Sequence, residues 1–388
     1  MQEPANVLLI TCDQLRADAL GCYGNSAIRT PHIDAIAGEG IRFDRAFVAS
    51  PVCSPNRASI ATGRYPSVHG LTMNGIELST SEVTMMECFR RKGYVTCGVG
   101  KMHFGPQWRC PSAESTSDPD PSLAINPQPS CSEIPWYGFD SAWITEDNRV
   151  GPYADYLEKH GFDPWADPHS FTYPQHITQR SVYPLEHHQS TWIGDRAIEF
   201  VEAQLADRPF FIWVSFVDPH HPFTVPAPYD TMYDSEAMPP STWREGEFNR
   251  WPQCYLEKWQ AESGGHEAIG MRSLAEADFR RIRAYYYGAI SLIDAQVGRL
   301  LEQLDVQGLT ENTIIVFTSD HGEMLGDHHL LFKNTHFDEV TRVPLMVCYP
   351  EGSVAAGSAS RRFVSSVDIM PTLLQLAGID LPQTLQGR

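Results

Sequence analysis

The stretch Val7-Leu8-Leu9-Ile10-Thr11, followed closely by Asp13 and Gln14, carries the strongest fold signal in the chain. A continuous apolar run of this length is typical of a strand that is buried on both faces of a parallel sheet. Three more runs end in polar clusters: residues 95–99 before Gly100-Lys101-Met102-His103, 210–217 before Asp218-Pro219-His220-His221, and 313–318 before Asp320-His321. Because ligands bind beyond the carboxyl ends of strands in open α/β sheets, the four clusters are predicted to lie together.

Helices are expected between these strands, because parallel strands need crossover connections. The longest is predicted at about 273–304, with Ser273 and Glu276 as a capping box and Gly308 as the stop. Shorter helices are predicted at 81–91, 191–205 and 368–376. The fold class is therefore α/β, an αβα sandwich with a large, mostly parallel central sheet.

The chain has 388 residues, 42% of them hydrophobic and 20% charged, which is enough for one large core or two modest domains. We expect one catalytic domain over residues 1–388, with long loops at 106–135 and 222–271 near its site. The second loop contains Trp243, Trp251, Tyr255 and Trp259. We favour a substrate rim for this loop, and the alternative for both loops is a surface insertion.

The charge balance argues against nucleic acid as a partner. Lys and Arg number 29 against 48 Asp and Glu, a net charge of −19, whereas binding to a phosphate backbone relies on clustered cations. No apolar stretch approaches membrane-spanning length, and the run at 7–10 is too short for a secretory signal. The nine cysteines have no regular spacing, which fits a reducing compartment. We therefore expect a cytoplasmic protein with no membrane partner.

The run Cys53-Ser54-Pro55-Asn56-Arg57 points to an anion site. Ser54 is predicted to cap a helix that starts at Pro55 and ends at Gly63. A helix N-terminus favours anions, and Arg57 adds donors suited to sulfate or phosphate. Cys53 is therefore a candidate nucleophile, although its spacing alone fits a buried structural cysteine equally well.

A metal site is the second candidate feature. A parallel sheet brings Asp13 and Gln14, after the first strand, close to Asp320 and His321, after a late one. Carboxylate, amide and imidazole ligands suit Ca²⁺, Mn²⁺ or Mg²⁺ better than metals that prefer thiolates. Each pair taken alone also fits an ordinary turn or cap.

The pattern Cys-x-Pro-x-Arg at 53–57, with Thr-Gly-Arg at 62–64, resembles the signature of the formylglycine-dependent sulfatases of the alkaline phosphatase superfamily. This resemblance implies an alkaline-phosphatase-like fold. It also implies that a formylglycine-generating maturation enzyme oxidises Cys53 to an aldehyde, whose hydrate is the nucleophile. The metal ligands implied are Asp13, Gln14, modified Cys53, Asp320 and His321, holding one divalent ion, Ca²⁺ with Mn²⁺ as the alternative.

The resemblance also assigns roles outside the metal site. The lysine and histidine of Gly100-Lys101-Met102-His103 match residues that contact the ester and the hydrated aldehyde. In Pro219-His220-His221-Pro222, His220 matches the general acid, and Lys333 matches a second lysine on the sulfate oxygens. The implied catalytic set is Cys53, Arg57, Lys101, His103, His220 and Lys333. Asn74 and His69 are added as residues on the substrate side, His69 as one that orients the nucleophile.

The implied reaction is hydrolysis of a small-molecule or glycan sulfate ester to an alcohol and sulfate. Three residues, Gln14, His321 and Asn74, resemble those of one branch of the family, the phosphonate monoester hydrolases and choline sulfatases. Some members of this branch use Mn²⁺ and form homo-oligomers. A phosphonate monoester or phosphodiester hydrolase is therefore the alternative, because these substrates also carry one negative charge. The resemblance covers residues 6–387. Family members generally continue for roughly another hundred residues into a smaller antiparallel C-terminal subdomain, which we expect to be absent or truncated in this chain.

Overall fold

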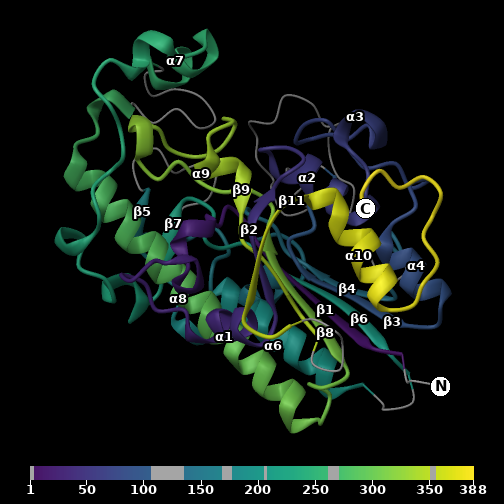
Figure 1. Ribbon diagram of the computed structural model, residues 1–388. Coiled ribbons are helices and arrows are strands. Elements are labelled where there is room, and N and C mark those ends of the chain that lie inside the picture. The colour runs from purple at the N-terminus through teal and green to yellow at the C-terminus, as the bar shows by residue number, and fades with distance from the viewer. Residues whose placement is uncertain (1–3, 106–134, 168–176, 205–207, 261–270, 350–354) are drawn as a thin grey trace, which may run out of the picture.

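A nine-stranded sheet forms the centre of the protein (Figure 1). The structure is a computed structural model that describes residues 4–105, 135–167, 177–204, 208–260, 271–349 and 355–388. Within these residues the strand order is β11-β2-β10-β8-β1-β6-β3-β4, and β9 pairs with β2. The strands are β1 (Asn6–Cys12), β2 (Ile41–Phe47), β3 (Val95–Gly100), β4 (Ser141–Ile144), β6 (Phe210–Phe216), β8 (Thr313–Ser319), β9 (Arg342–Val343), β10 (Leu345–Cys348) and β11 (Ser358–Ser365).

The four apolar runs form the middle of this sheet, as predicted. β1 pairs in parallel with β6 on one side and with β8 on the other, and β3 pairs in parallel with β6. Every residue of β1, β6 and β8 is buried, which is why their sequences are continuously apolar. The carboxyl ends of β3, β6, β1 and β8 therefore lie at one edge of the sheet.

The other side of the sheet departs from a purely parallel arrangement. β10 runs antiparallel to both β8 and β2, and β11 pairs in parallel with β2 at the edge. Residues of β2 and β11 are mostly half-buried or exposed. Their mixed sequences carry no continuous apolar run, so the sequence did not reveal these strands.

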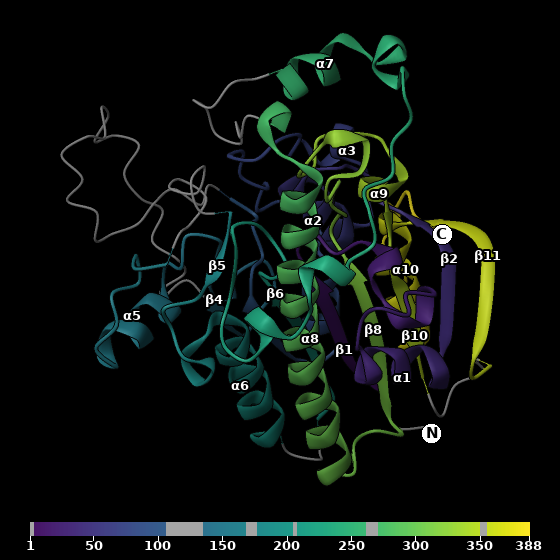
Figure 2. The ribbon, with the colours of Figure 1, turned by 90° about the vertical axis from the view of Figure 1, so that its left-hand side faces the viewer.

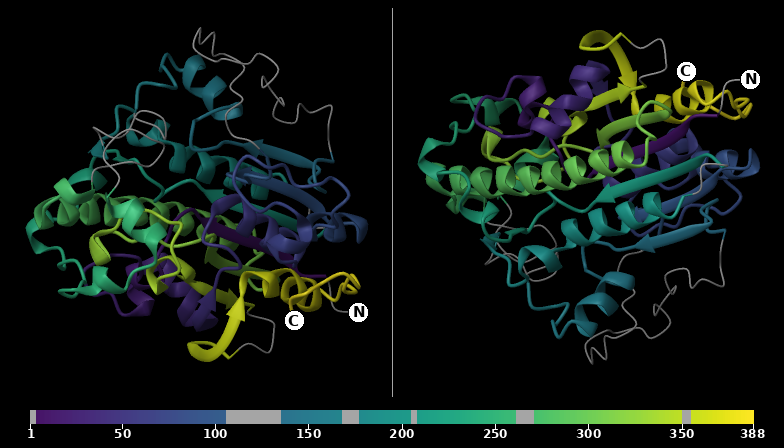
Figure 3. Two further views of the ribbon diagram at one scale, coloured as in Figure 1. Left: turned by 90° about the horizontal axis from the view of Figure 1, so that it is seen from above. Right: turned by 90° about the horizontal axis from the view of Figure 1, so that it is seen from below.

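Helices cover both faces of the sheet, which confirms the αβα sandwich (Figures 2 and 3). Leu8 and Ile10 of β1 pack on one face with α1 (Pro31–Glu39), α5 (Pro152–Lys159), α6 (Gln189–Glu202) and α8 (Glu276–Val306). Val7 and Leu9 pack on the other face with α2 (Cys53–Thr62), α4 (Met85–Arg91) and α10 (Ile369–Leu376). No helix in the described ranges is long and apolar enough to cross a membrane.

Two helix starts differ from their predictions. The capping box of Ser273 and Glu276 is wrong: Ser273 lies in a short 3-10 helix, and α8 begins at Glu276 after Ala275. The backbone N–H of Ala275 instead donates to the Asp278 carboxylate at 3.0 Å. The helix expected at 81–91 begins only at Met85, because Thr84 accepts the N–H of Glu87 and caps it. The predicted stop at Gly308 is confirmed. Gln307 is the C-cap of α8, and Gly308 follows it with a left-handed φ of +66°.

The two predicted loops have different outcomes. The loop at 106–135 lies outside the described residues except for its last position. The segment from 222 contains β7 (Phe223–Val225), which pairs with β5 (Thr178–Arg180), then short 3-10 helices and α7 (Gln253–Gln260). Figure 2 shows α7 on the side of the sheet at which β1 and β8 end.

Candidate active site

Side chains from four neighbouring strands meet at the carboxyl edge of the sheet. They are Asp13 and Gln14 after β1, Lys101 after β3, His220 after β6, and Asp320 and His321 after β8. All six are buried, with at most 6% of their surface exposed. The first residue of α2, Cys53, is buried in the same place. Parallel strands end at one edge, and this is what brings residues from such distant parts of the chain together.

Four of these residues form a compact group of possible metal ligands. Asp13, Cys53, Asp320 and His321 each offer a donor atom within 4.8 Å of the others. His321 Nε2 lies 3.2 Å from Cys53 Sγ and 3.4 Å from Asp13 Oδ1. The sequence-predicted ligands from the first and last of the four strands are therefore in contact.

The donor set fits a divalent cation. Asp13 Oδ1 and Gln14 Oε1 are both buried and have no hydrogen-bond partner in the described part of the chain. An unpaired buried oxygen costs roughly 1–3 kcal/mol, which a bound cation would offset. Oxygen donors with one imidazole suit a hard or borderline divalent ion.

The helix that carries Cys53 starts earlier than predicted. Cys53 itself is the first residue of α2, Val52 is its N-cap, and Ser54 is inside the helix, so the assignment of Ser54 as the cap is wrong. The N–H of Ser54 donates to Asn74 Oδ1 at 3.2 Å, so a residue twenty positions away does the capping. The predicted end at Gly63 is confirmed, with a φ of +63° and a bond from its N–H to Ser59 O of 2.9 Å.

The two residues expected on the substrate side lie at different ends of α2. The contact with Ser54 places Asn74 beside Cys53. His69 lies further along the helix, where its Nε2 is 3.1 Å from Ser59 Oγ and its Nδ1 accepts the N–H of Leu71. These contacts make His69 a support for α2.

Arg57 lies behind the metal-ligand group and holds its carboxylates. Its Nε donates to Asp320 Oδ2 at 2.7 Å, its Nη2 lies 3.5 Å from Asp13 Oδ2, and its Nη1 donates to Ser215 Oγ at 2.6 Å. The side chain is fully buried. Its guanidinium therefore orients both carboxylates as well as adding positive charge to the site.

Two buried lysines belong to the site, and one of them contacts Cys53. Lys333 Nζ donates to Cys53 Sγ at 2.7 Å and lies 2.8 Å from His220 Nε2. Lys101 Nζ lies 2.5 Å from carboxylate oxygens of both Asp13 and Asp147. Burial acts to lower the pKa of each lysine, but nearby negative groups outweigh burial: Asp13 and Asp147 raise the pKa of Lys101, and Cys53 with Asp13 raises that of Lys333. Both lysines therefore stay charged.

The two histidines assigned to proton transfer are neutral. Burial first, and then Lys333, lowers the pKa of His220 well below its usual value, and burial with Lys101 does the same for His103. His220 Nδ1 lies 2.5 Å from the carbonyl oxygen of His221, so Nδ1 carries the proton. His220 Nε2 then faces Lys333 as an acceptor. His103 is anchored by its backbone N–H, which donates to Glu146 Oε1 at 3.0 Å.

The sequence missed two carboxylates of this site. Asp147 contacts Lys101 and lies 4.0 Å from His220 Nε2. Glu323 contacts Gln14. Asp147 follows β4 in the same way that the predicted site residues follow their strands. It was missed because β4 has only four residues, so its sequence shows no continuous apolar run. Glu323 lies three residues after Asp320 and had no distinguishing signal.

The aromatic loop is attached to the segment that carries Lys333. Lys258 Nζ, on α7, donates to the carbonyl oxygen of Lys333. The N–H of His336 donates to Tyr255 Oη at 2.7 Å. α7 therefore packs beside the polar cluster, where a rim of the site is expected.

A second contact of the aromatic loop, between Glu247 and His328, predicts that the stability of the protein depends on pH. His328 Nδ1 lies 3.0 Å from Glu247 Oε2, and its Nε2 lies 3.8 Å from Glu339 Oε1 on α9 (Asp338–Thr341). Glu339 first, together with Glu247, raises the pKa of His328 to about 9. The folded protein binds this proton more tightly than the unfolded chain, so the stabilisation is complete below about pH 6.5 and is lost as the pH rises through about 9.

We expect His328→Gln to remove about 1 kcal/mol of stability at pH 6 and almost none at pH 10, since solvent screens these partly exposed groups. Urea unfolding of both proteins at the two pH values measures the difference. An equal loss at both pH values would show that the charge on His328 contributes nothing.

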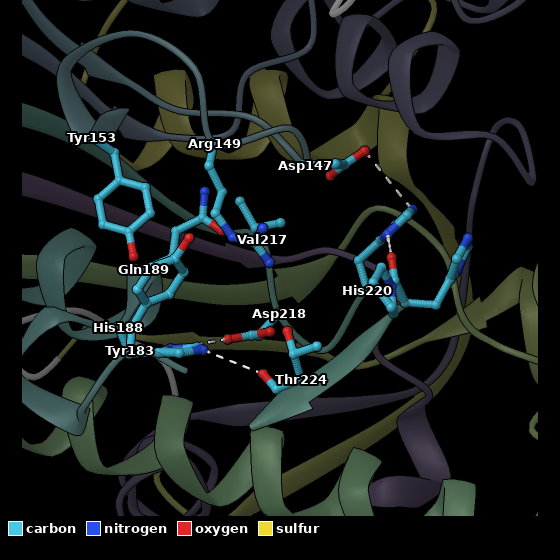
Figure 4. Close-up of a pocket in the computed structure, with 12 residues that line it drawn as sticks. Asp147, Arg149, Tyr153, Tyr183, His188, Gln189, Val217, Asp218, His220 and Thr224 are labelled. Carbon is cyan, nitrogen blue, oxygen red and sulfur yellow. Dashed lines mark hydrogen bonds and ion pairs between the residues drawn. The ribbon is translucent and has the colours of Figure 1, made fainter. Parts of the chain in front are cut away.

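A small pocket opens beside His220. Figure 4 shows that its lining is polar, with Arg149, Gln189 and Asp218 drawn around it and His220 at one end. Asp218 Oδ2 accepts the Ser190 hydroxyl at 2.5 Å and lies 3.8 Å from His188 Nδ1.

Comparisons with known proteins agree on one family. The family model described as "Sulfatase" matches residues 5–379. An arylsulfatase of Clostridium perfringens is 33% identical over 98% of this chain and 76% of its own length. PehA of Trinickia caryophylli, described as a multifunctional alkaline phosphatase superfamily protein, is 32% identical over 99% of this chain and 76% of its own length.

A solved structure supports the same relationship. The phosphonate monoester hydrolase of Agrobacterium radiobacter superposes with a TM-score of 0.80 at 29% identity. The match covers 99% of this chain and 75% of that protein. The chain thus spans about three quarters of the length of each of these relatives.

Proposed function

The chain belongs to the sulfatase family of the alkaline phosphatase superfamily, and we propose that it hydrolyses a sulfate ester to an alcohol and inorganic sulfate. One observation carries this proposal. Cys53 lies fully buried at the start of α2, within 2.7 Å of Lys333 Nζ and 3.2 Å of His321 Nε2, in a group of four possible metal ligands. A nucleophile precursor, a cation and metal ligands are thus in mutual contact.

Five side chains are proposed to hold one divalent ion, Ca²⁺ or alternatively Mn²⁺: Asp13, Gln14, the residue at 53, Asp320 and His321. A bound ion would supply a Lewis acid that neutralises charge on the ester oxygens. A formylglycine made from Cys53 by a maturation enzyme would, once hydrated, supply the hydroxyl that attacks sulfur. Arg57 keeps the carboxylates of Asp13 and Asp320 in place for this arrangement.

The charges of the site favour an anion in a protein that is otherwise strongly acidic. The buried carboxylates that contact the cations of the site are Asp13, Asp147 and Asp320, and the cations are Arg57, Lys101 and Lys333. These six groups balance one another, and even with the further carboxylate of Glu323 a divalent ion makes the site net positive. Lys333 and Lys101 are then proposed to bind the sulfuryl oxygens.

Two histidines are proposed to move protons. His220, whose Nδ1 is tied to the carbonyl of His221, accepts at Nε2 from the charged Lys333; it is proposed to take a proton from that ammonium on Nε2 and to pass it to the departing alkoxide. His103 is neutral and buried, and is proposed to accept the proton of the remaining hydroxyl of the hydrate after the attack, so that the aldehyde re-forms and sulfate is released.

A general acid matters most when the leaving group is poor. We expect His220→Ala to lower kcat/KM about 10²–10⁴-fold for an alkyl sulfate and less than about tenfold for 4-nitrophenyl sulfate. Steady-state kinetics on both substrates measure this, with exposed His160→Ala as the control. Equal losses on the two substrates would contradict the acid role of His220.

The alternative activity is hydrolysis of a phosphonate monoester or phosphodiester. Two observations favour it. The chain superposes on a phosphonate monoester hydrolase with a TM-score of 0.80, and the pair Gln14 and His321 meets at Asp320, which both residues contact. The same nucleophile, cations and proton donors would serve, because the tetrahedral groups have similar geometry and the same single charge.

The deciding experiment is kcat/KM of the matured protein for an aryl sulfate and for a phenylphosphonate monoester with the same leaving group, each with Ca²⁺ or Mn²⁺. A higher value for the sulfate supports the proposed function. A higher value for the phosphonate replaces it with the alternative.

We further propose that residues 1–388 act as one catalytic domain and that the substrate is a small-molecule or glycan sulfate ester. The polar pocket beside His220 supports a hydroxylated or charged alcohol. A cytoplasmic location is proposed from the nine cysteines, whose irregular spacing fits a reducing compartment.

A further inference from the structure

Gln14 differs from the other proposed metal ligands because only one end of its amide can bind a cation. The oxygen Oε1 has lone pairs to offer, whereas Nε2 carries two N–H donors. A cation that faced Nε2 would meet the positive end of the amide dipole. The orientation of this side chain therefore determines whether the site can bind metal through it.

Hydrogen bonds to the amide nitrogen of Gln14 determine how its side-chain amide is oriented. Gln14 Nε2 donates to Glu323 Oε2, and it lies 2.9 Å from His221 Nδ1. All three side chains are buried. At the other end, Gln14 Oε1 has no hydrogen-bond partner among the described residues.

Glu323 is held so that its Oε2 faces Gln14. Its Oε1 accepts the backbone N–H of Leu325 at 3.0 Å and that of Phe332. This leaves Oε2 as the atom that accepts from the NH₂ of Gln14.

His221 closes the other side of the amide nitrogen. Its ring lies between those of His220 and Phe332, with both centroid distances 4.1 Å. This packing fixes the ring with Nδ1 directed at Gln14 Nε2. A ring nitrogen that faces an amide NH₂ acts as an acceptor, so His221 and Glu323 select the same orientation.

The backbone of Gln14 is fixed as well. Its φ of +69° lies in the left-handed region that side-chain-bearing residues seldom adopt. Its N–H donates to Asp320 Oδ1 at 3.1 Å, and its carbonyl accepts the Tyr286 hydroxyl at 2.7 Å. Backbone and side chain together direct Oε1 to one position.

We infer that Glu323 is a positioning residue for the metal: together with His221 it orients the Gln14 amide so that its oxygen faces the ion, and so sets the affinity of the site. This inference rests on the metal site of the proposed function. It assigns Glu323 and His221 a role that acts through Gln14 and not on the substrate.

The test is Glu323→Gln, which keeps the size of the side chain. Its amide oxygen has to stay with the N–H groups of Leu325 and Phe332, so its NH₂ faces Gln14. Gln14 then turns its oxygen toward position 323 and its NH₂ toward the ion. We expect the Kd for Mn²⁺, titrated into the unmatured, metal-stripped protein by calorimetry, to rise about 10–100-fold.

A rescue variant separates orientation from simple damage. Gln14→Glu combined with Glu323→Gln exchanges the two groups and leaves the charge unchanged. The NH₂ at position 323 then donates to a carboxylate at position 14, whose other oxygen faces the ion. We expect this double variant to bind Mn²⁺ within about tenfold of the wild-type affinity.

Asp294→Asn is the matched control. Asp294 is a buried carboxylate on α8 that also accepts two backbone N–H groups, those of His32 at 3.0 Å and Ile33 at 2.8 Å. We expect it to lower the melting temperature and leave the Kd for Mn²⁺ unchanged.

Each other result overturns the inference. An unchanged Kd in Glu323→Gln shows that Glu323 does not orient Gln14, while the metal site itself stands. Failure of the double variant to recover, or a weaker Kd in Asp294→Asn, reduces Glu323 to a structural residue. No binding of Mn²⁺ or Ca²⁺ by the wild-type protein would remove the metal-dependent function as well, which distinguishes the two failures.

Discussion

Cys53→Ala is expected to lower kcat for a sulfate ester at least about 10⁴-fold, because it removes the residue from which the nucleophile is made. The side chain is buried at the first position of α2, with Lys333 and His321 as its neighbours. No other cysteine belongs to the metal-ligand group found among the described residues. Alanine fits the space and preserves the helix, so the fold should be retained.

The measurement is turnover by protein co-expressed with a formylglycine-generating enzyme, together with mass spectrometry of the peptide that contains position 53. Cys254→Ala is the matched control, because that cysteine is exposed on α7. Full activity in Cys53→Ala would rule out the proposed mechanism. Full activity of wild-type protein without conversion at position 53 would rule out the formylglycine and leave Cys53 itself as the nucleophile.

Asp13→Asn is expected to have the second largest effect, with metal affinity lowered at least about 100-fold and kcat/KM lowered about 10³-fold or more. Asp13 Oδ2 contacts Lys101 at 2.5 Å, and Oδ1 is unpaired on the side of the metal-ligand group. An asparagine has to direct its NH₂ either at the Lys101 ammonium or at the ion. Either choice places a donor against a positive charge.

Metal content after dialysis and the Kd for Ca²⁺ and Mn²⁺ measure the first effect, and steady-state kinetics measure the second. In the wild type, chelation followed by re-addition of the ion should remove and restore activity. Asp44→Asn is the control, because Asp44 is a partly exposed carboxylate that also pairs with an arginine, Arg42. An Asp13→Asn protein with normal activity would contradict the proposed ligand set.

Strand prediction succeeded where burial is complete. β1, β6 and β8 are buried at every residue, so each sequence is continuously apolar and its identity could be read directly. β2 and β11 are paired with each other at the edge and remain partly exposed, so their sequences mix polar and apolar residues. Such partly exposed strands have no distinctive pattern in a single sequence.

Helix boundaries show a similar division. The end of α2 at Gly63 follows from a local conformational preference and was predicted. Its beginning was not, because the cap comes from Asn74 across a loop and not from Ser54. The start of α8 was misplaced because Ser273 lies in a preceding 3-10 turn.

The sequence by itself determined the α/β class, the four central strands and the family, because these depend on local burial and on residue patterns close together in the chain. Only the tertiary structure showed which groups touch: Lys101 with Asp147, Asn74 with the start of α2, and Gln14 with Glu323, which are 309 positions apart. Hydrogen bonds between distant residues depend on strand order and loop course, which no local pattern encodes. For that reason the residue types of the site were readable from the sequence, whereas the orientation of the Gln14 amide was not.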